Sequence, residues 1–221
     1  ENGLSTEERE DLQENLFAKF NGVPERRINK ENAVELADLV KEYSKIVFLG
    51  DPGAGKTTLL RYLALLHAQS LRKEVPTTAE LGTARLPLYF RIADFAEKSN
   101  GQALINFLPA NICGRDHNDK ALKILTEAWL AQGKCLVLLD GLDEVIEPDQ
   151  RAEISEQINL FIRHHEEKGN RFIVTSRVAG YRTAPLTGAI PHYRVRDMND
   201  KQIEKFLQQW CYAVERFQTP D

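Results

Sequence analysis

The 221-residue chain has few of the residues that mark several protein classes. Its three cysteines are odd in number, lie far apart and have no Cys-x-x-Cys or metal-binding spacing; they are Cys113, Cys135 and Cys211. We expect reduced thiols, as in a cytoplasmic protein. No run of about 18 apolar residues occurs, so no membrane span is predicted. The acidic, polar N-terminus does not have the pattern of a signal peptide.

Clustered basic residues are also missing. The chain has 29 Lys and Arg residues against 33 Asp and Glu residues, which gives a net charge of −4. Residues 1–45 hold 11 acidic and 7 basic side chains, so this segment accounts for the whole net charge. Because affinity for nucleic acid depends on gathered Lys and Arg, the sequence argues against nucleic acid as a partner of this domain.

What is present is the composition of an ordinary globular domain, with 42% hydrophobic and 28% charged residues. The length suits one domain with a short appendage. We expect a linker or helix over residues 1–30, a core over 31–198, and the start of a further helical domain over 199–221. Met198 is the only methionine, from which we expect that the chain is a piece of a longer protein.

The most informative stretch has the phosphate-binding pattern G-x-x-x-x-G-K-[ST] without a mismatch. It runs Gly50-Asp51-Pro52-Gly53-Ala54-Gly55-Lys56-Thr57. The glycines let backbone N–H groups converge on a phosphate chain, and the following helix offers its positive end. Lys56 adds a charge for the outer phosphates, Thr57 a hydroxyl for Mg²⁺, and Thr58 a further donor. A buried strand over 46–49 and a helix over 59–71, apolar on most sides and therefore expected to be buried, flank the loop.

A second apolar strand, over residues 135–140, ends in an acid, Asp140. Open α/β sheets bind ligands beyond the carboxyl ends of their strands, and Mg²⁺ prefers carboxylate, water and phosphate oxygens. Downstream of a P-loop, this pattern predicts a Walker B motif in which Asp140 and Thr57 hold Mg²⁺. Asp143 and Glu144 follow one turn later, where either could polarise a water that attacks the γ-phosphate. A structural role in a solvated loop is the alternative for this acid pair.

The acids follow the order Asp140-Gly-Leu-Asp143-Glu144. This order resembles the extended Walker B motif of NACHT domains, a branch of the STAND-type P-loop NTPases of signalling proteins. The strand over 172–176 with Arg177 after it is similar to the sensor 1 strand of that family, and residues 178–182 resemble bacterial NACHT sequences. The resemblance spans residues 46–210. It implies that Arg177 contacts the γ-phosphate, with a structural salt bridge as the alternative.

Strands alternate with helices along the chain, which predicts an α/β fold with a doubly wound parallel sheet. Further strands are predicted over 86–92 and 193–195, and helices over 31–43, 103–112, 120–131, 149–167 and 199–214. The resemblance implies the three-layer α/β/α architecture of P-loop NTPases with the strand order 5-1-4-3-2. That order would bring Lys56, Asp140 and Arg177 to one edge of the sheet.

Three of the predicted helices have apolar stripes that we expect to face the core. The stripes are Leu122, Leu125 and Trp129 in the first, Ile154, Ile158, Phe161 and Ile162 in the second, and Ile203, Phe206, Leu207 and Trp210 in the third. Gly133 is expected to end the first of these helices, and Pro148 suits the first turn of the second.

The resemblance also implies what the domain does. It implies a domain that binds ATP or ADP with Mg²⁺, with GTP left open as the nucleotide. Two functions remain. The first is a slow NTPase whose hydrolysis resets an oligomerising signalling or defence sensor, with sensor and effector domains outside this chain. The second is a nucleotide-gated interaction module with little hydrolysis. Asp143 and Glu144 together favour the first.

Overall fold

The computed structural model describes residues 36–72, 81–99, 102–112, 120–196 and six positions between 200 and 208. The predicted linker over 1–30 lies outside the described residues, as do Cys113, Phe206, Trp210 and Cys211. Everything below concerns the described residues.

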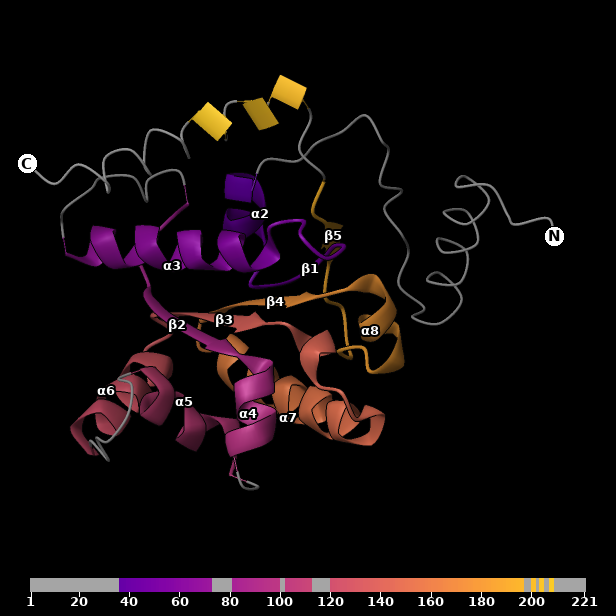
Figure 1. The fold of residues 1–221 in the computed structure, drawn as a ribbon. Coiled ribbons are helices and arrows are strands. Elements are labelled where there is room, and N and C mark those ends of the chain that lie inside the picture. The colour runs from indigo at the N-terminus through magenta and orange to yellow at the C-terminus, as the bar shows by residue number, and fades with distance from the viewer. Residues whose placement is uncertain are drawn as a thin grey trace, which may run out of the picture.

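A five-stranded sheet organises the fold (Figure 1). Its strands are β1 (Lys45–Leu49), β2 (Leu86–Arg91), β3 (Cys135–Asp140), β4 (Arg171–Ser176) and β5 (His192–Arg194). The order across the sheet is β2-β3-β4-β1-β5, and every neighbouring pair is parallel. Taken from the opposite edge, this is the predicted order 5-1-4-3-2, which is confirmed. Because all five strands point the same way, their carboxyl ends share one edge of the sheet, where ligands bind in such folds.

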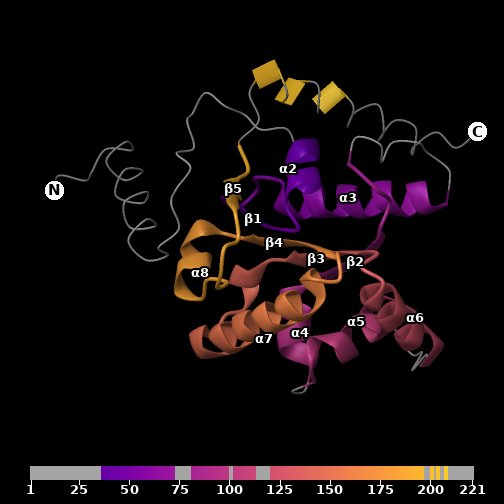
Figure 2. The same ribbon diagram turned by 180° about the vertical axis from the view of Figure 1, so that it is seen from behind.

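Helices cover both faces of the sheet. They are α2 (Leu36–Glu42), α3 (Lys56–Leu71), α4 (Ile92–Lys98), α5 (Leu104–Ile112), α6 (Lys120–Ala131), α7 (Pro148–Glu166) and α8 (Val178–Thr183), with a 3₁₀ turn η2 (Leu142–Glu144). Figure 1 shows α2 and α3 on one side and α4 to α7 on the other, and Figure 2 shows the same layers from behind. The three-layer α/β/α architecture is therefore confirmed. None of these described helices has the length and hydrophobicity that a membrane span requires.

The core continues through the sheet into both helical layers. Ile46 and Phe48 of β1 pack in one cluster with Leu60 of α3, whereas Val47 and Leu49 belong to the cluster on the other face. Alternate residues of a strand point to opposite faces, so a sheet covered on both sides needs apolar residues at every position. This explains why β1, β3 and β4 are continuous apolar runs.

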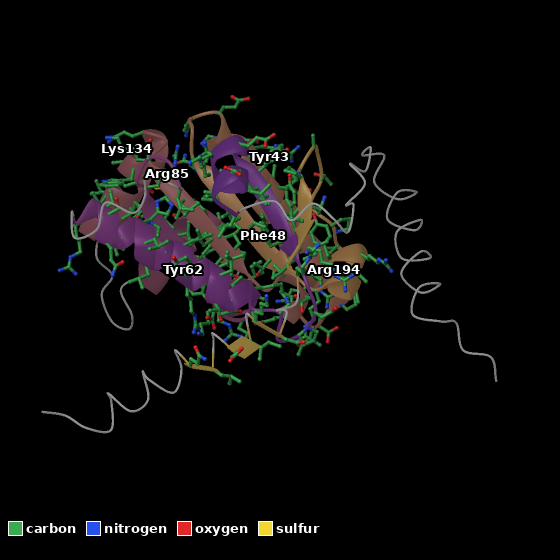
Figure 3. The ribbon with its side chains drawn as sticks, turned by 90° about the horizontal axis from the view of Figure 1, so that it is seen from above. Tyr43, Phe48, Tyr62, Arg85, Lys134 and Arg194 are labelled. Carbon is green, nitrogen blue, oxygen red and sulfur yellow. The ribbon has the colours of Figure 1, made fainter. Side chains whose placement is uncertain are left out.

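The predicted buried faces are correct for one helix and wrong for parts of two others. On α7 the stripe is buried as predicted, with Pro148 at its first position. On α3, however, Tyr62 and Leu65 are each 54% exposed, since this outer helix packs only one face on the sheet (Tyr62, Figure 3). Leu125 of α6 is also exposed, and the buried face of that helix carries Leu130 instead.

Two further expectations need correction. Ile203 and Leu207, predicted to face inward, are 43% and 52% exposed. The strand predicted over 86–92 ends one residue early, because Ile92 begins α4, a helix that the sequence patterns do not predict. Ile92 is fully buried in the helix, so the apolar pattern is the same for a strand or a helix at this position.

Gly133, which ends α6 as predicted, offers a test of backbone packing. Its φ is +69°, and a Cβ there would lie 1.8 Å from the carbonyl oxygen of Lys168; Gly188 has a φ of +97° but open space around it. We predict that Gly133→Ala lowers the free energy of unfolding by at least about 3 kcal/mol, since a clash adds to the roughly 1–2 kcal/mol cost of a left-handed alanine. Gly188→Ala, the control, should lose only that cost in urea unfolding. Equal losses would contradict the clash.

Candidate functional site

The loop between β1 and α3 has the backbone that its glycines predict. Gly53 and Gly55 have φ values of +83° and +86°, which side chains other than glycine rarely adopt. A Cβ at either position would meet nothing within 4 Å, so conformation rather than space requires glycine there. Gly50 is different, because its Cβ would lie 3.2 Å from the Cβ of Ala54. The Ala54 N–H donates to the Asp51 carbonyl at 3.1 Å and closes the turn.

The loop leads directly into the positive end of α3. Gly55 is the N-cap, and no side chain caps the helix, which begins at Lys56 with Thr57 and Thr58 in its first turn. The first N–H groups of the helix are therefore donors without a side-chain acceptor, as in sites that bind phosphate. Lys56 lies over the loop, its Nζ donating to the carbonyl oxygens of Gly50 at 2.7 Å and Asp51 at 3.0 Å.

The exposed part of the loop is held from β5. Pro52 lies in the exposed turn between Asp51 and Gly53. The Asp51 carboxylate accepts a hydrogen bond from Arg194 at 2.9 Å, in a pair whose side chains are 61% and 48% exposed. Figure 3 labels Arg194 at this end of the molecule. Because the pair is exposed, its contribution to stability is small.

Asp140 ends β3 as predicted and is only 4% exposed. Its Oδ1 accepts from the Thr175 hydroxyl at 2.6 Å and its Oδ2 from the Tyr89 hydroxyl at 3.0 Å. Thr175 in turn accepts from the Gly141 N–H at 3.0 Å. Burial, together with the nearby Asp140 charge, raises the pKa of Tyr89, so its hydroxyl remains a donor at neutral pH. The carboxylate is therefore fixed in one orientation.

The donor set fits Mg²⁺. A carboxylate oxygen has two lone pairs, so each oxygen of Asp140 keeps one after accepting its hydrogen bond. The Thr57 hydroxyl is a second hard oxygen donor of the kind that Mg²⁺ prefers. Among the described residues no three His, Cys, Asp or Glu side chains gather into a metal cluster. A site with few protein ligands suits an ion that retains waters and binds substrate phosphates.

Asp143 is bound by Arg177, the residue after β4. The Arg177 backbone N–H donates to Oδ1 at 2.8 Å, and Nε lies 3.1 Å from Oδ2. The Asp143 side chain is 10% exposed and that of Arg177 is 54% exposed. A Cβ at Gly180 of α8 would lie 2.3 Å from the Cβ of Asp143, so only glycine allows this approach of α8 to η2. Both oxygens of Asp143 are thus used to position Arg177.

Glu144 has more freedom than its neighbour. One oxygen, Oε2, accepts from Nη2 of Arg91 at 2.6 Å, and the side chain is 37% exposed. The hydrogen bond to Glu144 raises the pKa of Arg91. Gly141 has a φ of +77°, and a Cβ there would lie 2.8 Å from Cδ of Glu144. The Glu144 side chain therefore folds back beside the residue that follows Asp140.

The end of β4 joins the two halves of the site. The Gly50 N–H donates to the Ser176 carbonyl at 3.3 Å, and Thr175 and Arg177 bond Asp140 and Asp143 as described. The cation of Lys56 is bonded to loop carbonyls and not to any of these described acids. The predicted residues thus gather at the carboxyl ends of β1, β3 and β4.

Four residues that bond the predicted site residues were not themselves predicted from the sequence: Tyr89, Arg91, Thr175 and Arg194. Only Thr175 carries a visible signal, since it is a hydroxyl residue at the end of an apolar strand. The other three reach the site through the register of neighbouring strands, because Arg91 lies opposite Asp140 and Arg194 opposite Leu49, the residue before the P-loop.

A parallel sheet in this order, a phosphate loop between β1 and α3, and an acid at the end of β3 define the P-loop NTPase fold. A family model described as the NACHT domain matches residues 44–213, which is most of the chain. The chain therefore belongs to the NACHT domain family, as its motifs predict, and is a nucleotide-binding module of the P-loop NTPase type. A search of curated proteins found no match.

The buried hydroxyl of Thr175 gives a prediction with a matched control. Thr175→Val keeps the shape but leaves the buried Gly141 N–H and Asp140 without this partner, so we expect a loss of about 1–3 kcal/mol of stability and weaker Mg²⁺-dependent nucleotide binding. Tyr89→Phe, the control, removes a bond to the same carboxylate without leaving a buried donor unpaired. Its loss of stability should be smaller in thermal unfolding. A Thr175→Val protein as stable as the parent would contradict this account of the hydroxyl.

Proposed function

We propose that this NACHT domain binds ATP with Mg²⁺ and hydrolyses it slowly, with GTP as the alternative nucleotide. The observation that carries the proposal is the shared position of three features at the carboxyl edge of the sheet. They are the P-loop before an uncapped helix, the oriented carboxylate of Asp140, and the pair of Asp143 with Arg177. A triphosphate needs converging donors, a metal ligand and a cation, and this edge has all three.

Each group has a proposed role in holding the nucleotide. The N–H groups of Asp51, Gly53 and Gly55, with Lys56, Thr57 and Thr58, bind the phosphate oxygens. Gly50 and Ala54 hold the loop in shape through their own N–H bonds to Ser176 and Asp51, and Pro52 shapes the turn. Thr57 and Asp140 hold Mg²⁺, which neutralises charge on the β and γ phosphates when it is bound. Arg177, positioned by Asp143, reaches the γ-phosphate with the exposed part of its guanidinium.

The acid pair then divides into two roles. Asp143 is a positioning residue for Arg177, since both of its oxygens are bonded to that residue. Glu144 polarises the attacking water, because it is the more exposed of the two and has one oxygen outside its bond to Arg91. The Glu144 side chain lies beside Gly141, the residue directly after Asp140. This position supports the role, since common Walker B motifs have glutamate directly after the metal-binding aspartate.

In the complete protein, we propose that this domain is the nucleotide switch of a cytoplasmic, oligomerising signalling or defence sensor. Sensor and effector functions would belong to parts outside residues 1–221. A nucleotide-gated interaction module with little hydrolysis is the second candidate. It is favoured by the engagement of both acids in ion pairs, which hydrolysis would have to disturb.

Lys56→Ala tests whether the loop is the nucleotide site. A unit charge about 4 Å from a phosphate is worth roughly 4 kcal/mol at an effective dielectric constant of 20, so affinity for ATP with Mg²⁺ should fall by at least about 10²-fold. Isothermal titration calorimetry measures this. Lys134→Gln is the matched control, since it removes an exposed charge at the opposite edge of the sheet and should leave affinity unchanged. Unchanged affinity in Lys56→Ala would place the nucleotide elsewhere.

Glu144→Gln and Asp143→Asn separate chemistry from positioning. Glu144→Gln should keep ATP bound and slow multiple-turnover hydrolysis by about 10²-fold, the usual contribution of a general base. Asp143→Asn should instead reduce the preference for ATP over ADP, because Arg177 loses its ion pair. Phosphate release and ADP competition measure the two effects. If neither substitution changes turnover, the acid pair is structural and the nucleotide-gated module replaces the hydrolysing switch.

A further inference from the structure

A polar cavity lies at the amino edge of the sheet, away from the candidate nucleotide site. It has a volume of about 150 Å³ and is lined by residues that include Lys41, His67, Arg85 and Arg171. Arg85 immediately precedes β2, and Arg171 is the first residue of β4. Figure 3 shows Arg85 on the opposite side of the view from Arg194, which contacts the P-loop. The cavity is therefore separate from the site already described.

His67 of α3 is one of the residues that line this cavity, and one of its ring nitrogens has no hydrogen-bond partner among the described residues. The side chain is 1% exposed, and its Nδ1 accepts a hydrogen bond from the Arg85 backbone N–H at 3.1 Å. Burial, followed by the charges of Arg85 and Arg171, lowers the pKa of His67 to about 4, so the ring is neutral at pH 7. Because Nδ1 is an acceptor, the proton lies on Nε2. This buried Nε2 has no hydrogen-bond partner in the part of the chain that the structure describes, and such buried polar atoms are rare in folded proteins.

Arg85 is held rigidly beside His67. Its Nη1 donates to the carbonyl oxygens of Gly133 at 2.6 Å and Gly169 at 2.8 Å. These bonds occupy both hydrogens of Nη1, so Nε and Nη2 keep three hydrogens without an acceptor among the described residues. The guanidinium is therefore fixed in place with most of its donors still available.

Arg171 brings a second fixed cation to the same cavity. Its guanidinium donates to the carbonyl oxygens of Tyr43 at 2.7 Å, Lys41 at 3.0 Å and Val40, at the end of α2. No carboxylate among the described residues forms a salt bridge with Arg85 or Arg171. Burial lowers the pKa of both, and the charge of Arg171 lowers that of Arg85 further. Two neighbouring cations with no counter-ion among the described residues favour the binding of an anion.

We propose that this cavity binds a small phosphate-type oxyanion, either inorganic phosphate or the phosphate group of a small metabolite. Such an anion is rich in acceptors, which matches a cavity lined by the neutral His67, by Arg85 with its remaining Nε and Nη2 donors, and by the cation of Arg171. The cavity volume of about 150 Å³ limits the ligand to a single small group. The site is also distant from the P-loop, since His67 lies 11 residues beyond Lys56 on α3, or roughly 16 Å at 1.5 Å per residue.

The test uses the whole 221-residue chain with Lys56→Ala, which weakens phosphate binding at the P-loop. Inorganic phosphate is titrated while the His67 imidazole ¹⁵N and ¹H signals are followed by NMR, with calorimetry in parallel. We expect a saturable shift of the His67 Nε2–H signal. Arg85→Gln should weaken phosphate binding at least tenfold, and Lys134→Gln, which removes an exposed charge at the same edge, less than twofold. Sulfate should compete, and acetate should compete far more weakly.

The outcomes separate the possible occupants. Tighter binding of glycerol 3-phosphate than of inorganic phosphate would identify an organic phosphate as the source, and the reverse would identify the free ion. If phosphate leaves the His67 signals unchanged up to about 10 mM, or if Arg85→Gln and Lys134→Gln bind it equally, the proposal is wrong. If Arg85→Gln does not fold, the response of the His67 signals to phosphate in the chain that retains Arg85 still tests the proposal.

Discussion

The carboxyl end of β4 is the constraint on which the nucleotide site depends. Residues 175–177 bond the first glycine of the P-loop and the carboxylates of Asp140 and Asp143. This is possible because β4 lies between β1 and β3 and runs parallel to both. A shift of β4 by one residue would turn Thr175 to the opposite face of the sheet and remove its bond to Asp140. Strand register thus determines the geometry of the site.

Two close approaches then shape the acid pair. Gly180 lets α8 reach the backbone of η2, where Asp143 meets Arg177, and Gly141 leaves space for Glu144 to fold back. In the common motif, glutamate directly follows the aspartate. Here Gly141 follows Asp140 instead, and its lack of a side chain makes room for Glu144. This brings a carboxylate from three residues further along the chain back beside that position. In the extended motif a turn of the chain thus places a glutamate carboxylate beside the position after Asp140, where the common motif has a glutamate in the sequence itself.

Sequence patterns predicted the α/β class and the P-loop because both depend on local features, namely apolar runs, glycine spacing and helix periodicity, whereas the strand order was implied by the resemblance to NACHT domains. The bonds of Tyr89 and Arg91 were not predicted, because they depend on the register between β2 and β3 and not only on the two strands being neighbours. Helix faces failed for a related reason. Tyr62 and Leu65 are apolar but exposed, since exposure depends on what covers the outer side of α3 and not on the helix itself.

The two edges of the sheet differ in electrostatic character. At the carboxyl edge, the described acids are matched by cations, as in the pairs of Asp143 with Arg177 and Glu144 with Arg91. At the amino edge, Arg85 and Arg171 have no described carboxylate. One helix, α3, connects the two regions, because it begins at the P-loop and its residue His67 lines the cavity at the amino edge. Ligands at its two ends would be coupled only if α3 had two positions with different affinities, and that coupling would be reciprocal. If α3 keeps one position, ligand binding at one site does not change the affinity of the other. Whether the two sites are coupled therefore depends on whether this helix moves.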